Sequence, residues 1–179
     1  MDFLINKLHK KGVIILDFGS QYTQLIARRV REQNVYSEVL PTDTPLDQIK
    51  NRDPSAIILS GGPSSVFAEE APSFDKKIFD IGIPILGICY GLQLLAHHYG
   101  GLVESNGIGE YGFAEIEIDD NKKLFQNVSK TSQVWMSHMD RVTKIPNGWH
   151  VLAHSSNGVI AAMSNQDQSI VATQFHPEV

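Results

Sequence analysis

The chain has 179 residues, 42% of them apolar and 20% charged, which is typical of a single globular domain with one sizeable core. A formal net charge of -5 with scattered basic side chains leaves no continuous positive surface for a phosphate backbone, so we expect no nucleic-acid partner. No apolar run approaches the ~20 residues that cross a bilayer, and the opening MDFLINKLHKKG has too short an apolar segment for a signal peptide, so we expect a cytoplasmic protein without a membrane partner.

After an N-terminal extension at residues 1–11, the first half alternates short apolar runs with amphipathic segments, as parallel strands connected by helices do. Three continuous apolar runs predict strands buried on both faces of a sheet: GVIILDF (12–18), AIILSGGP (56–63) and IPILGIC (83–89). Three amphipathic segments predict the helices that accompany them: YTQLIARRVREQN (22–34), SFDKKIFDIG (73–82) and GLQLLAHHYGG (91–101).

After residue 102 the chain consists of short, partly alternating runs separated by polar turns, which is typical of antiparallel strands that continue or flank the first sheet. We therefore predict a three-layer, doubly wound α/β fold with a mostly parallel, flavodoxin-like sheet and an antiparallel C-terminal part. Ligands of such sheets bind at the carboxyl ends of the parallel strands. The residues expected at these ends are Asp17, Gly61, Gly62 and Cys89.

The single cysteine, Cys89, stands in GICYG at a predicted strand-to-helix junction. A nucleophile occupies this position in the sharp elbow of hydrolases, and Gly87 and Gly91 would let neighbouring backbone pass without a Cβ clash. The helix N-terminus would also favour a thiolate, because its free N–H groups carry partial positive charge. A lone cysteine in an apolar run is more often a small buried hydrophobe, but the glycines make a nucleophile about as good an interpretation.

The chain ends in QFHPEV, where His176 and Glu178 flank a proline. Proline biases the residue before it toward extended backbone, and residues two apart on an extended chain face the same side. Glu178 could therefore orient His176 and stabilise its imidazolium, as the third member of a catalytic triad does. By itself HPE is more typical of a surface turn, but together with the elbow of Cys89 it predicts a Cys-His-Glu triad.

A glycine pair in LSGGPSS follows another predicted strand. Backbone N–H groups at such a turn can point at a developing oxyanion, and the loss of one such donor costs about 10²–10³ in rate. We assign the oxyanion hole to the N–H groups of Gly62 and of Tyr90, the residue after the expected nucleophile. A GGP turn is a weak motif on its own, so this assignment depends on Cys89.

In chain order, LSGGPSS, GICYGLQ and FHPE resemble the class I, triad-type glutamine amidotransferases, and the resemblance runs from about residue 12 to the end. The stretches ILDFGSQYTQLIARRVRE and VWMSHMD are most similar to the family members that serve GMP synthesis. The resemblance implies that residues 12–179 are an amidotransferase domain. It implies that Cys89 is the nucleophile, His176 the general base and acid, and Glu178 its orienting partner. The residues implied to hold glutamine, the last three largely through backbone, are Gln93, Ser137, Met139 and Asp140.

The resemblance also implies the chemistry and the partners. Glutamine would be hydrolysed to glutamate and ammonia through a glutamyl thioester, with no metal or cofactor in this domain. ATP and magnesium would belong to an ATP-pyrophosphatase synthetase domain, fused or separate, that aminates XMP to GMP and is absent from this chain. We expect the full-length enzyme to be a homodimer. Family members continue beyond HPE into a final helix, so we expect the chain to be a fragment truncated after this motif.

Other interpretations stay open. The chain could serve a different ammonia acceptor, although DFGSQYTQ argues against this, or it could be a stand-alone γ-glutamyl thiol hydrolase or a non-catalytic regulatory module. Gln93 could be an ordinary surface residue of its helix. For His138, near the expected substrate segment, a packing role is at least as good an interpretation as a functional one.

Overall fold

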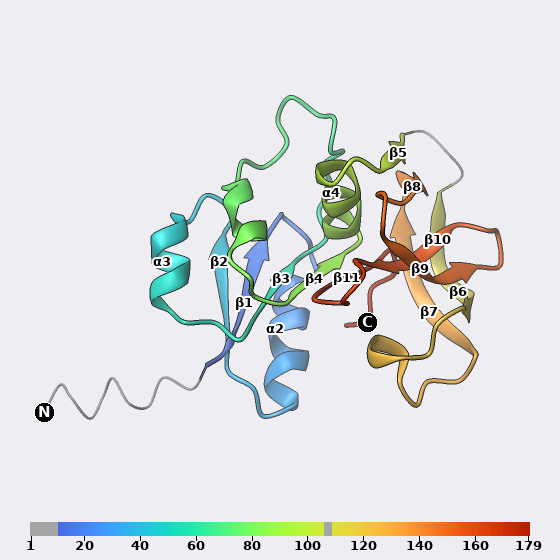
Figure 1. Ribbon diagram of the computed structural model, residues 1–179, viewed down its shortest axis with the longest axis horizontal. Coiled ribbons are helices and arrows are strands. Elements are labelled where there is room, and N and C mark those ends of the chain that lie inside the picture. Colours follow the sequence, from blue (N-terminus) through green and yellow to red (C-terminus); the bar gives the residue numbers. More distant parts are fainter. Residues whose placement is uncertain (1–10, 106–108) are drawn as a thin grey trace, which may run out of the picture.

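The structure is a computed structural model that describes residues 11–105 and 109–179, so the expected N-terminal extension lies almost wholly outside it. Its main feature is a nine-stranded sheet in the order β2-β1-β3-β4-β11-β10-β9-β6-β7 (Figure 1). The parallel strands of this sheet are β1 (Val13–Asp17), β2 (Ser37–Pro41), β3 (Ala56–Leu59), β4 (Ile85–Ile88) and β11 (Ile170–Thr173). Their order is that of a flavodoxin-like, doubly wound sheet, which confirms the predicted fold class.

The C-terminal part continues the same sheet with antiparallel strands, as predicted. These strands are β6 (Glu110–Ile118), β7 (Thr131–His138), β9 (His150–Ser155) and β10 (Ile160–Ser164). A separate two-stranded sheet pairs β5 (Leu102–Glu104) with β8 (Arg141–Lys144). In Figure 1 the parallel strands occupy the left of the molecule and the antiparallel strands the right, so β11 connects two differently built halves.

Helices cover both faces of the parallel strands. Successive side chains of a strand point to opposite faces, and in β1 Ile15 shares a cluster with α2 (Thr23–Glu32), whereas Leu16 belongs to the core on the other face. That second face is covered by α3 (Leu46–Asn51), the 3-10 helix η2 (Lys76–Asp80) and α4 (Tyr90–His98). The predicted three-layer arrangement is therefore confirmed. A further 3-10 helix, η3 (Lys123–Phe125), packs on the antiparallel half. Among the described residues, no helix is long and apolar enough to cross a membrane.

The helix predicted at 73–82 is wrong in type and extent, because only the 3-10 helix η2 forms there. The Asp75 side chain caps it by accepting a hydrogen bond from the N–H of Lys77 at 3.0 Å. Gly82, with a φ of 72°, then turns the chain toward β4. Pro72 precedes the segment and Gly82 is its last residue, and the apolar side chains of η2 still cover the sheet.

The other two predicted helices are confirmed with shifted ends. The helix expected at 91–101 begins earlier, at Tyr90, and ends at His98. Gly100, with a φ of 84°, terminates it, and the N–H of Gly101 donates to the carbonyl oxygen of Ala96 at 2.8 Å. This is the glycine-dependent helix ending that the Gly-Gly signal predicts. Two short elements, β2 and α3, were not predicted, because each mixes polar with apolar residues over a single turn or strand.

Candidate active site

The candidate site lies at the carboxyl ends of β1, β3 and β4, where the sequence predicts it. Cys89 follows β4 directly and precedes α4, and its φ of 53° and ψ of -102° place it in a sharp turn. Such a positive φ costs a residue with a Cβ about 1–3 kcal/mol, so the surrounding structure must hold the turn in place. One constraint is the N–H of Cys89, which donates to the carbonyl oxygen of Thr173 at 2.7 Å. The predicted strand-to-helix elbow is present.

The glycines on both sides of Cys89 allow α4 to lie directly on the sheet. A Cβ on Gly87 would lie 2.7 Å from the carbonyl oxygen of Gly91, and a Cβ on Gly91 would lie 2.6 Å from the carbonyl oxygen of Leu59. Ordinary Cβ contacts are never this short. The close backbone approach that the sequence predicts at these two positions is therefore confirmed.

His176 and Glu178 meet in the geometry expected of an oriented histidine. His176 Nδ1 lies 2.8 Å from Glu178 Oε1, and the two residues are only 4% and 3% exposed. The N–H of His176 donates to the carbonyl oxygen of Trp135 at 2.9 Å, which ties the segment after β11 to β7. Water therefore has little access to the histidine–carboxylate pair.

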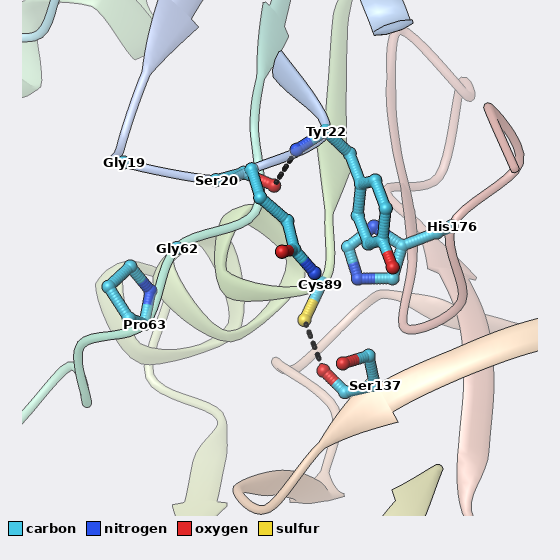
Figure 2. A pocket seen from close by; sticks show the side chains of 9 residues that line it. Gly19, Ser20, Tyr22, Gly62, Pro63, Cys89, Ser137 and His176 are labelled. Carbon is cyan, nitrogen blue, oxygen red and sulfur yellow. Dashed lines mark hydrogen bonds between the residues drawn. The ribbon is translucent and has the colours of Figure 1, made fainter. Parts of the chain in front are cut away.

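The environment of His176 favours its protonated form. Burial lowers the pKa of His176, but hydrogen bonds with Cys89 and Glu178 outweigh burial and raise the pKa from 6.5 to about 9. Figure 2 shows Cys89 and His176 lining the same hollow, with the sulfur also pointing toward Ser137. A histidine that carries a proton beside a nucleophile can deliver that proton to a leaving group.

Two residues at helix α2 that the sequence analysis did not identify contact His176 and Glu178. The ring of Tyr22, just before α2, packs edge-on against the imidazole of His176, with ring centroids 5.1 Å apart. Arg29 Nε donates to the backbone carbonyl oxygen of Glu178 at 2.9 Å. The helix itself was predicted, but no local signal indicates that it faces the last residues of the chain.

Two hollows meet at Cys89. One, of about 280 Å³, is lined by residues 19–22 and His176, and the other, of about 250 Å³, by Gln93 and residues 137–140. Both are smaller than the ~300–1,000 Å³ pockets of drug-sized ligands, which suits a small metabolite. Among the described residues, no group of three or more His, Cys, Asp or Glu side chains could hold a metal ion. The residues that both hollows share are Gly62, Pro63, Cys89 and Ser137.

Gly62 lines both hollows beside Cys89, and Tyr90 directly follows Cys89 in the chain. A Cβ on Gly62 would lie 2.5 Å from the carbonyl oxygen of Phe18, so only glycine lets the loop after β3 pass this close to the end of β1. Tyr90 is the first residue of α4, and an N–H in the first turn has no acceptor within its helix. The arrangement suits stabilisation of an oxyanion, and the assignment of these two N–H groups stays a prediction.

The residues predicted to hold the substrate gather at the second hollow. Gln93 is 3% exposed, which contradicts the alternative of an ordinary surface residue, and its Nε2 donates to the carbonyl oxygen of Asp140 at 2.8 Å. The carbonyl oxygen of Ser137 lies 3.6 Å from Cys89 Sγ. Their role in substrate binding stays a prediction. All four of the predicted substrate residues are among those that line this hollow: Gln93, Ser137, Met139 and Asp140.

The carboxylate of Asp140 is engaged by the protein itself. Its Oδ2 accepts hydrogen bonds from Ser65 Oγ at 2.6 Å and from Ser105 Oγ at 3.2 Å. These contacts fasten the segment after β7 to the loop after β3 and to the end of β5. Since the side chain is used in this way, it is not free for a ligand, and contact with a substrate through the backbone of the segment stays a prediction.

Gln174 is a further residue at the site that sequence analysis missed. It is fully buried, its Nε2 donates to Cys89 Sγ at 3.7 Å, and its Oε1 accepts from Gln93 Nε2 at 3.5 Å. The sequence did contain a signal for this residue, because a glutamine directly before FHPE interrupts an otherwise apolar strand end. Gln174 connects Cys89 to Gln93, which in turn contacts Asp140.

Comparisons with known proteins place these features in a family. A family model described as glutamine amidotransferase class-I matches residues 14–179. The chain is 54% identical over 172 residues to "GMP synthase [glutamine-hydrolyzing]" of Campylobacter jejuni subsp. jejuni, and 54% identical over 167 residues to the protein of that name from Brachyspira hyodysenteriae. These matches cover 96% and 93% of this chain but 34% and 32% of the relatives, so the chain spans about a third of their length.

Solved structures share the fold. The structure of a protein described as a GMP synthase subunit, from Thermoplasma acidophilum, matches with a TM-score of 0.80 and 30% identity over 96% of this chain and 86% of that one. A glutamine amidotransferase from Thermotoga maritima matches with a TM-score of 0.76 and 25% identity, over 96% of this chain and 78% of that one. The predicted fold class is confirmed by these likenesses.

Proposed function

The chain belongs to the class-I glutamine amidotransferase family, and we propose that it hydrolyses glutamine to glutamate and ammonia through the triad Cys89, His176 and Glu178. One observation supports the proposal more strongly than any other. The only cysteine of the chain stands in a strained strand-to-helix turn beside a buried histidine that is itself paired with a carboxylate. This constellation supplies a nucleophile and a proton carrier that line one hollow, with an orienting group bonded to the imidazole.

In the first half of the reaction, the sulfur of Cys89 attacks the carboxamide carbon of glutamine and a C–S bond forms. The carbonyl oxygen becomes an oxyanion, which the N–H groups of Gly62 and Tyr90 stabilise. His176 then gives its proton to the amide nitrogen, the C–N bond breaks, and ammonia leaves. A γ-glutamyl thioester remains on Cys89.

In the second half, His176 accepts a proton from a water molecule that attacks the thioester carbonyl. The C–S bond breaks, glutamate leaves, and the proton returns to the sulfur–imidazole pair. Glu178 keeps Nδ1 of His176 protonated, so Nε2 stays free to exchange protons with the reacting groups. The raised pKa of His176, about 9, supports its role as the acid in the first half.

The substrate would lie in the hollow lined by Gln93 and residues 137–140, with its carboxamide at the sulfur of Cys89. The backbone of this segment would receive the α-amino and α-carboxyl groups. The volume of about 250 Å³ and the polar lining support an amino-acid ligand. No metal or cofactor takes part in this scheme.

We further propose that the ammonia is used to aminate XMP to GMP. The support is the high identity to proteins named GMP synthase [glutamine-hydrolyzing], of which this chain corresponds to about a third. The ATP- and magnesium-dependent step would then belong to a synthetase part outside this chain, and the complete enzyme would act as a homodimer. If a molecule other than XMP accepted the ammonia, the hydrolysis of glutamine by this chain would proceed in the same way.

A glutaminase assay tests the proposal. The natural protein and a Cys89→Ala variant are compared for release of glutamate, with and without XMP and ATP. We expect the natural protein to release glutamate and the variant to release none, with thermal unfolding of both proteins as a control for folding. Glutamate release that is unchanged in the variant would refute the assignment of the nucleophile, and stimulation by XMP and ATP would support GMP synthesis.

A further inference from the structure

A second buried carboxylate–histidine pair lies beside the candidate glutamine site. Glu110 opens β6 and His138 closes β7, and the two residues are directly opposite in the antiparallel register, so their side chains lie on one face. His138 Nε2 is 3.2 Å from Glu110 Oε2, and the side chains are 1% and 4% exposed. Burial of such groups is costly unless each polar atom has a hydrogen-bond partner, and both residues have further partners.

Glu110 is anchored on its other side by the antiparallel half of the sheet. Its Oε1 accepts hydrogen bonds from Ser155 Oγ and from Asn157 Nδ2, both at 2.8 Å. Ser155 is the last residue of β9, and Asn157 lies in the exposed turn that follows. The carboxylate thus has three partners, and two of them, at the end of β9 and in the turn after it, hold it from outside the segment 137–140.

His138 carries this fixed position to the substrate segment. Its Nδ1 lies 3.0 Å from the carbonyl oxygen of Asp140, the same oxygen that accepts from Gln93 Nε2 at 2.8 Å. The imidazole ring therefore connects the carbonyl oxygen of Asp140 to the carboxylate of Glu110, with one ring nitrogen at each. The peptide group of Asp140 is therefore held by α4 on one side and by Glu110, through His138, on the other.

We propose that Glu110 and His138 are positioning residues that hold residues 137–140 in the conformation that binds glutamine. The inference rests on the proposed function, because it takes the hollow lined by this segment as the glutamine site. One residue along the same strand pair, Tyr111 and Ser137 line that hollow. His138 lines the hollow as well, so its contact with Glu110 reaches the wall of the proposed glutamine site directly.

The first test variant is Glu110→Gln, which keeps the side-chain volume and removes the charge that holds His138. We expect the KM for glutamine to rise about tenfold while kcat changes by less than about threefold, since a lost charge-assisted hydrogen bond loosens the binding segment without touching Cys89 or His176. In a Cys89→Ala background, calorimetry should show the same increase in the dissociation constant of glutamine. The rate of Cys89 alkylation by iodoacetamide should stay unchanged, which a general loss of structure would not allow.

A milder variant and a matched control complete the design. Asn157→Ala removes one donor to Glu110 from an exposed turn that tolerates substitution, and we expect KM to rise about two- to threefold with kcat unchanged. Asp119→Asn removes the carboxylate beside His154, a pair of the same chemistry that is exposed at the opposite end of β6. This control should leave both kinetic constants unchanged.

The outcomes separate this inference from the proposed function. An unchanged KM in Glu110→Gln, or in Asn157→Ala should the first variant fail to fold, would overturn the positioning role. Equal losses in kcat, glutamine binding and alkylation rate would overturn it as well, because they would indicate a purely structural role. A natural protein that shows no glutaminase activity would instead overturn the proposed function, and this inference with it.

Discussion

Replacement of Glu178 by glutamine removes the negative charge that faces His176 and preserves the volume of the side chain. The two groups are 2.8 Å apart and almost fully buried, so water cannot replace the lost interaction. A hydrogen bond to a charged group is worth about 1.5–3 kcal/mol, and one pKa unit corresponds to about 1.4 kcal/mol. The pKa of His176 should therefore fall by about one to two units from its value of about 9.

The same change should also lower kcat, and by a larger factor than the fall in the pKa of His176 alone would produce. The amide of a glutamine at position 178 can donate to Nδ1, and the imidazole then carries its hydrogen on Nε2, where it cannot accept a proton. In serine proteases the equivalent change lowers kcat about 10⁴-fold, and we expect a loss of about 10²–10⁴-fold here.

The assay combines NMR titration of the histidine side chains from about pH 5 to 10 with kcat for glutamine hydrolysis on the same samples. Asp119→Asn serves as the control, since it removes the carboxylate beside His154 and should leave the titration of His176 in place. A Glu178→Gln protein with an unchanged His176 titration and unchanged kcat would refute the assigned role of Glu178.

Three further predictions concern packing, support of the triad and pH. Gly87→Ala places a Cβ 2.7 Å from the backbone of α4 and should lower the free energy of unfolding in urea by about 1–3 kcal/mol, and equal stability would contradict the close packing at the elbow. Arg29→Ala removes the donor to the carbonyl oxygen of Glu178 and should lower kcat/KM about fivefold, whereas Arg28→Ala, which removes a guanidinium bonded within the same helix, should have no effect. Because the pKa of His176 is raised from 6.5 to about 9, its protonated form stabilises the fold fully below about pH 6.5, and this contribution is lost as the pH rises through about 9. The free energy of unfolding in urea should fall by up to about 3 kcal/mol more over this pH range in the natural protein than in His176→Gln. Parallel pH profiles of the two proteins would contradict this contribution of His176.

The parts of the site that could be predicted are those with a local signal. The elbow is encoded by glycines within two residues of Cys89, and the imidazole–carboxylate contact by the spacing of His176 and Glu178 around a proline. The contact of Arg29 with Glu178 joins residues 149 positions apart, and the network of Glu110 depends on the register of β6 and β7. Such contacts are decided by long-range packing, which leaves no periodic pattern in a single sequence.

The fold shows the same division. Continuous apolar runs identified β1, β3 and β4, because strands buried on both faces need apolar side chains at every position. The segment 73–82 has the apolar spacing of a helix, but only the 3-10 helix η2 forms between the cap at Asp75 and the turn at Gly82. Strand β2 was missed because it is only partly buried and carries polar residues.

The central claim, that Cys89 carries the glutamyl group during turnover, is tested most directly by trapping the intermediate. The protein is mixed with excess glutamine, quenched rapidly in acid, digested and analysed by peptide mass spectrometry. We predict that the peptide containing Cys89 gains the mass of glutamine less that of ammonia, and that hydroxylamine removes this adduct. Hydrolysis of glutamine with Cys89 unmodified throughout, or with the adduct on another residue, would contradict the account.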